Sequence, residues 1–172
     1  MLVCAALAGC GADEPLGPDS GTLPVGELLV GGAENDGTGF VELADGADAE
    51  LVPGAQGGFH VWINVRVLGV AGPLYLEREA RRASDGALVL AGSRQALEVS
   101  EDAMEDWWEN PAAAPSFMCP APVGITVFDT PLHFSVTLSD PDGNVVAEDE
   151  ITLVPRCPTG EQAAFCLNVC DG

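Results

Sequence analysis

Residues 57–70 read GGFHVWINVRVLGV and carry the clearest pattern in the chain. Apolar residues alternate there with a second set, so the two sets fall on opposite faces of one extended strand. The apolar set is Phe59, Val61, Ile63, Val65 and Val67. Because an apolar strand face must be covered, this stretch requires a second β-layer and predicts a sandwich or a barrel.

A second alternating stretch, residues 132–139, places Leu132, Phe134 and Val136 on one face and predicts another half-buried strand. Short strands of this kind, separated by turns, are typical of an all-β antiparallel sandwich with seven to nine strands. The predicted strands cover residues 39–43, 59–69, 74–82, 87–91, 95–99, 124–129, 132–139 and 145–154, with residues 27–30 as a short first strand.

Turn residues separate these strands. Ser84-Asp85-Gly86 predicts a hairpin, because glycine accepts the positive φ that a tight hairpin turn requires. The charged residues before it predict a solvent-exposed edge strand that is protected from pairing with other chains. They are Glu77, Arg78, Glu79, Arg81 and Arg82.

One segment predicts a helix. Residues 100–110 read SEDAMEDWWEN, with Ser100 as N-cap, acidic residues in the first turn and a stop before Pro111. Trp107 and Trp108 are adjacent and point about 100° apart on a helix, so one of them should be partly exposed. The proline-rich residues 111–122 predict a stiff loop that holds Cys119.

The composition limits the function classes. The 172 residues carry 27 acidic and 6 basic side chains, all six of them arginine, for a net charge of -21. Because phosphate binding depends on Lys and Arg, a nucleic-acid partner is excluded. No nucleophile elbow, zinc-protease motif or P-loop is present in the sequence, so we expect a protein that is not an enzyme and has no cofactor.

The amino-terminal residues resemble a bacterial lipobox, with Leu7-Ala8-Gly9 before Cys10. The resemblance implies a truncated signal peptide over residues 1–9, diacylation of Cys10 and a membrane partner through that lipid. Small, polar and proline residues follow and predict a flexible tether over residues 10–26, ahead of a single domain at 27–172. Because the residue after Cys10 is Gly11 and not aspartate, the resemblance implies the outer membrane.

Four cysteines remain in the predicted domain: Cys119, Cys157, Cys166 and Cys170. In an exported protein they imply two disulfides, for which three connectivities exist. We expect one bridge between the proline-rich loop and the carboxyl-terminal segment. A zinc site is the alternative, although it normally requires paired CxxC spacings that this chain lacks.

The candidate binding residues lie on the second face of the predicted strand at residues 59–69 and within the predicted helix at residues 100–110. They are His60, Trp62, Asn64, Arg66 and Trp108, with Trp62 as a stacking anchor for a sugar or a peptide. The alternative is that a neighbouring loop or the other β-layer covers Trp62. A metal site for copper or zinc is a second hypothesis, since His60 and His133 would be neighbours if their strands paired.

The turn Asp140-Pro141-Asp142-Gly143 resembles the last hairpin of immunoglobulin-like and fibronectin-type-III-like bacterial domains. Asp140, Asp142 and Asn144 also match part of a calcium loop, but its full acidic spacing and terminal glutamate are missing, so a turn is favoured. The whole chain resembles lipoproteins of high-GC predatory bacteria such as the myxobacteria. This implies a lipid-anchored module of the cell envelope that binds a protein or glycan partner or has a structural role.

Overall fold

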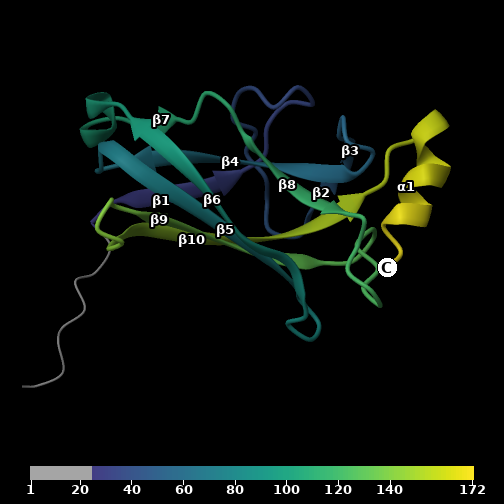
Figure 1. Ribbon diagram of the computed structural model, residues 1–172. Coiled ribbons are helices and arrows are strands. Elements are labelled where there is room, and N and C mark those ends of the chain that lie inside the picture. Colours follow the sequence, from purple (N-terminus) through teal and green to yellow (C-terminus); the bar gives the residue numbers. More distant parts are fainter. Residues whose placement is uncertain (1–24) are drawn as a thin grey trace, which may run out of the picture.

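The computed structural model describes residues 25–172, which form two β-sheets packed face to face (Figure 1). The predicted signal peptide, Cys10 and all but the last two residues of the predicted tether lie outside the described residues. No helix within residues 25–172 is long and apolar enough to cross a membrane.

The first sheet is organised around β4 (Phe59–Leu68), the strand of the opening stretch. Every strand that pairs with β4 is antiparallel to it. These partners are β1 (Glu27–Gly31), β3 (Val52–Pro53), β7 (Trp108–Glu109) and β8 (Ala114–Cys119). One long amphipathic strand therefore holds this whole layer together.

The second sheet contains five strands in the order β2-β10-β9-β5-β6. Its strands are β2 (Ala47–Glu50), β5 (Gly72–Arg82), β6 (Leu88–Val99), β9 (Leu132–Ser139) and β10 (Val145–Arg156). β2 runs parallel to β10, whereas the other pairs are antiparallel. The expected two-layered, all-β architecture is confirmed, with this one parallel pair as an addition.

The core lies between the two sheets and contains both predicted apolar faces. The five alternating residues from Phe59 to Val67 are fully buried. Leu132, Phe134 and Leu138 of β9 are fully buried as well, and Val136 is nearly so. The period of two therefore identified the inner wall of each layer, as strand geometry requires.

Several predicted boundaries are wrong. Residues 124–129 form no strand, and residues 39–43 contribute only an isolated bridge between Gly32 and Val41. The predicted strands at 87–91 and 95–99 are one continuous strand, β6. β8 lies inside the predicted loop at 111–122, and β2 and β3 lie between the predicted strands at 39–43 and 59–69, where no strand was predicted.

The charged strand β5 is not an edge strand, contrary to the sequence prediction. It lies between β6 and β9 in the middle of its sheet, and Arg78 is only 3% exposed. The turn at Ser84-Asp85-Gly86 is confirmed, because β5 and β6 pair antiparallel and Gly86 has a φ of +73°. The turn at residues 140–144 is confirmed too, since it joins β9 to β10.

The helical segments also differ from the prediction. The predicted helix at 100–110 is reduced to a 3₁₀ turn, η1 (Glu101–Met104), although the Ser100 side chain does cap it by accepting from the Asp102 N–H. The chain then leaves the helix and Trp108 pairs with Val67 of β4. The α-helix of the described chain is α1 (Ala163–Val169), preceded by a 3₁₀ turn, η2 (Gly160–Gln162).

Two disulfides connect the carboxyl-terminal segment to the sandwich. Cys119 at the end of β8 is bonded to Cys170, which confirms the expected bridge from the proline-rich region. Cys157, directly after β10, is bonded to Cys166 of α1. These bridges select one of the three connectivities that the spacing left open.

Candidate functional site

The predicted binding face on β4 is not an open surface. The segment between β1 and β2 covers it: the Trp62 indole N–H donates to the Asn35 carbonyl at 3.2 Å, and the ring lies against Gly37. Asn64 is fully buried and donates to the Gly39 carbonyl at 2.7 Å. The loop between β1 and β2 therefore covers much of this face, as the alternative expected, with His60 and Asn64 buried and Trp62 and Arg66 half-buried.

His60 is buried as well, with 5% of its surface exposed. Its ring packs against Trp62, with 4.4 Å between ring centroids, and against Phe117 at 5.7 Å. Neither ring nitrogen has a hydrogen-bond partner among residues 25–172. Burial lowers the pKa of His60, which favours a neutral imidazole.

The histidine pair expected for a metal site is not formed. β4 belongs to the first sheet and β9 to the second, so His60 and His133 do not face each other across paired strands. His133 instead contacts the Glu150 carboxylate at 3.2 Å. Among the described residues, the group with metal-ligand geometry consists of Cys157, Cys166 and Cys170, which are engaged in the disulfides.

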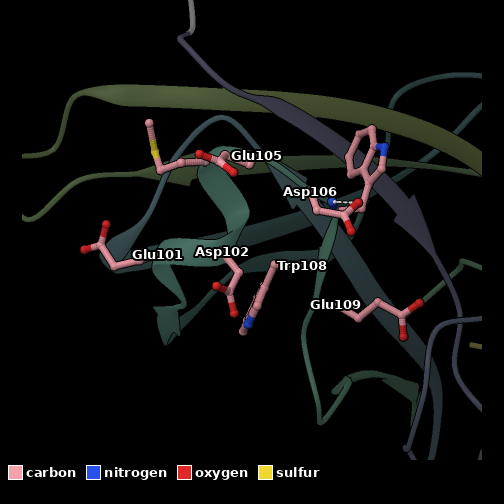
Figure 2. Close-up of a pocket in the computed structure, with 8 residues that line it drawn as sticks. Glu101, Asp102, Glu105, Asp106, Trp108 and Glu109 are labelled. Carbon is pink, nitrogen blue, oxygen red and sulfur yellow. Dashed lines mark hydrogen bonds between the residues drawn. The ribbon is translucent and has the colours of Figure 1, made fainter.

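Arg66 and Trp108 lead to a different site. Arg66 forms an ion pair with Glu109 and lies over the ring of Phe40 at 4.4 Å. Glu109 and Trp108 belong to β7 and line a surface pocket of about 820 Å³ (Figure 2). The other lining residues are Glu101, Asp102, Met104, Glu105, Asp106 and Trp107.

Backbone contacts hold this pocket against the end of the sandwich. Ala103 of η1 is fully buried, and its carbonyl accepts from the Gly69 N–H at 2.6 Å. The pairing of Trp108 with Val67 and a bond from the Asn110 N–H to the Val65 carbonyl fix the other side. Figure 2 shows the acidic side chains projecting from η1 and from the segment leading into β7.

The pocket is strongly acidic. Five carboxylates line it, and no basic residue is among its lining residues. Of the five, only Glu109 forms an ion pair within the described chain. Trp107 is 36% exposed, whereas Trp108 is packed partly against the core. One tryptophan is exposed as predicted, although the helix on which the prediction rested does not extend to these residues.

This geometry provides negative charge beside an exposed aromatic ring, which suits a cationic group. Sequence reasoning found Trp108 but assigned the acidic residues to a helix. The signal that would have found the pocket was the density of carboxylates around two tryptophans in residues 101–109.

Trp62 lines a second, smaller pocket of about 90 Å³. Its other lining residues include Asn35, Asp48 and Glu50. Asp48 is paired with Arg156 and the indole N–H is already bonded to Asn35, so neither group is free to bind a sugar.

Comparison with known proteins gives no family for this chain: no family matches the sequence, and no curated protein is detectably similar to it.

Proposed function

We propose that this chain is a non-catalytic, lipid-anchored interaction module of the bacterial cell envelope, built on an immunoglobulin-like sandwich, that binds a basic segment of a partner protein. The observation that carries this proposal is the pocket at η1 and β7, with its five carboxylates, its two tryptophans and no basic lining residue.

The pair between Arg66 and Glu109 indicates how such a partner would bind. The Arg66 guanidinium neutralises the Glu109 carboxylate at the pocket margin and stacks on the ring of Phe40. A second arginine from a partner would find the same combination in Glu105, Asp106 and the exposed Trp107 ring. The net charge of -21 would also attract a basic partner and accelerate its association at low salt.

Two further features support the envelope location. Paired cysteines are typical of exported proteins, because the cytosol keeps thiols reduced. The Leu7-to-Cys10 sequence resembles a lipobox.

Gly26 and Ala103 both contact Gly69, so the described chain begins at the pocket end of the sandwich. A membrane tether there would hold the pocket toward the lipid surface.

An arginine-rich peptide with a fluorescent label tests the binding site. We expect the variant Glu101→Gln, Glu105→Gln, Asp106→Asn to lose most of the affinity measured by anisotropy. The matched control is Glu50→Gln, Glu161→Gln, Asp171→Asn, which removes the same charge from exposed positions toward the α1 end of the sandwich and should keep the affinity. Equal losses in the two variants would contradict a specific site and indicate attraction by the overall charge alone.

The anchor needs a separate experiment. In a bacterial host with lipoprotein processing, Cys10→Ser should move the protein from the membrane fraction to the soluble fraction and remove the mass of the acyl groups. Unchanged membrane association of this variant would contradict the lipid anchor while leaving the peptide-binding result intact.

A further inference from the structure

The two disulfides contact each other beside α1, and Figure 1 shows α1 at the end of the sandwich opposite β7. Cys166 and Cys170 are four residues apart, which is about one helical turn, so both point toward the sandwich. Their sulfurs lie 3.8 Å apart although each is bonded to a different partner. Four sulfur atoms are thereby gathered into one cluster.

Only one member of this cluster is reachable from solvent. Cys166 and Cys170 are fully buried, and Cys119 is nearly so. Cys157 is partly exposed and lines a surface cavity of about 440 Å³. An incoming reagent therefore meets the Cys157–Cys166 bridge at Cys157 and cannot reach the Cys119–Cys170 bridge directly.

The cavity has an apolar wall beside Cys157. Arg156 also lines the cavity, but its guanidinium is paired with Asp48 and Asp129, so the approach to Cys157 depends on shape and exposure and not on an unpaired cation. Thiolates, not thiols, are the species that attack disulfides. Leu167, which is 45% exposed, forms an apolar part of the wall, and Phe165 of the same helix is 43% exposed. A thiol on an aliphatic carbon would contact this surface while its sulfur approached Cys157.

We propose that this cluster is a thiol–disulfide relay. A thiolate attacks the Cys157 sulfur, forms a mixed disulfide and releases Cys166 as a thiolate. The Cys166 thiolate then attacks Cys170 across the 3.8 Å contact, forms a Cys166–Cys170 bridge and releases Cys119 as a thiolate. Each step forms one S–S bond and breaks one, so the count of disulfides is conserved and no oxidant is needed.

The result is that a reaction at the surface frees a buried thiolate on Cys119. Cys119 ends β8, where the Gly58 backbone approaches so closely that an added Cβ would lie 2.2 Å from the Cys119 carbonyl oxygen. The relay thus connects thiol attack at the cavity to the release of a thiolate at the edge of the first sheet. This inference is independent of the peptide-binding function proposed above.

The experiment uses the oxidised protein and glutathione as the thiol, with timed alkylation and peptide mass spectrometry. Cleavage after Glu161 and Leu167 separates the three carboxyl-terminal cysteines. We expect glutathione on Cys157 together with a Cys166–Cys170 bridge and an alkylated Cys119. Glutathione on Cys119 or Cys170, or an alkylated Cys166 with the Cys119–Cys170 bridge intact, would overturn the relay.

A variant tests the internal step without any added thiol. Cys157→Ser leaves Cys166 unpaired, and alkylation of the acid-quenched, unfolded chain should then label Cys119, because the bridge has moved to Cys166–Cys170. The matched control is Cys166→Ser, in which the relay sulfur is missing and the Cys119–Cys170 bridge should persist. A Cys157–Cys170 bridge in that control would show that Cys166 is not the relay. If either variant fails to fold by circular dichroism, the glutathione experiment on the unmodified chain still decides.

Discussion

Arg78 is the most unusual residue of the interior. Its guanidinium donates to the Ser93 hydroxyl at 2.9 Å and to the Ser116 hydroxyl at 3.4 Å, while its Nε has no partner among residues 25–172. No carboxylate of the described chain forms an ion pair with it. Burial lowers its pKa to about 10, because the charged form loses its hydration.

Replacing this buried charge should stabilise the protein. We expect Arg78→Met to raise the free energy of unfolding by about 1–2 kcal/mol, because a buried charge is often replaced by an apolar side chain at a gain. The exposed Arg81→Met on the same strand is the control and should stay within about 0.5 kcal/mol of the parent. Urea unfolding at neutral pH measures both. A loss of stability in Arg78→Met would mean that the hydroxyl contacts outweigh the desolvation cost.

The same arginine predicts a dependence on alkaline pH. Above pH 10 the folded chain loses the Arg78 proton while the unfolded chain still keeps it, so the stability of the parent should rise with pH in that window. The free-energy cost of burying the charged guanidinium is present in full at lower pH. Urea midpoints at about pH 8 and about pH 11 measure this effect. The difference in stability between Arg78→Met and the parent should become smaller at the higher pH, since only the parent carries this proton.

His60 should make the fold sensitive to mild acid. Because burial lowers its pKa, the unfolded chain binds this proton first as the pH falls below about 6.5, and stability is lost until the folded-state pKa is reached. We expect His60→Phe, which keeps a ring between Trp62 and Phe117, to lose less stability between pH 7 and pH 5. His133→Gln is the control and should retain the loss of the parent. Identical pH profiles for all three proteins would contradict this role of His60.

At the scale of the elements, alternation predicted β4 and β9 well because a half-buried strand repeats every two residues. The sequence pattern did not predict β8, because its Pro115 is typical of a loop. Proline is tolerated there because β8 pairs on one side only, with β4, and its missing N–H is not needed. The sequence pattern did not predict α1 either. This helix has only seven residues, and the disulfides of Cys166 and Cys170 fix it to the sandwich.

The site was predicted less well than the fold. The outward face of β4 looked exposed because alternation distinguishes two faces but does not say whether a loop covers the polar one. The segment carrying Asn35 and Gly39 does so by hydrogen bonds to Trp62 and Asn64. The short pairing of Trp108 with Val67 ended the predicted helix and so created the acidic pocket, and no local pattern encodes that pairing.

The two disulfides should contribute unequally to stability. Removing Cys119 and Cys170 together by alanine substitution should cost about 4 kcal/mol, because that bridge spans 51 residues. Removing Cys157 and Cys166 should cost about 2.5 kcal/mol, since their separation is 9 residues. Unfolding in urea without reductant measures both double variants. Equal costs would mean that strain or solvation, and not chain entropy, determines the effect.

At the scale of the whole molecule, self-repulsion is the dominant electrostatic feature. With a net charge of -21, we expect the midpoint of thermal unfolding to rise as sodium chloride increases, because the Debye length falls from about 30 Å at 0.01 M to about 10 Å at 0.1 M. Calorimetry measures the midpoint, and potassium chloride at equal ionic strength is the control. A clear difference between the two salts would indicate specific ion binding in place of screening.

The arrangement of β1 has a mechanical consequence. β1 pairs antiparallel with β4 over Glu27–Gly31, and the strand starts toward the end of the sandwich opposite α1 (Figure 1). A pulling force applied between the amino-terminal side and the α1 end acts along β1, so its backbone hydrogen bonds to β4 bear the load together and do not open one after another. In that direction the domain should resist extension better than when it is pulled across its strands.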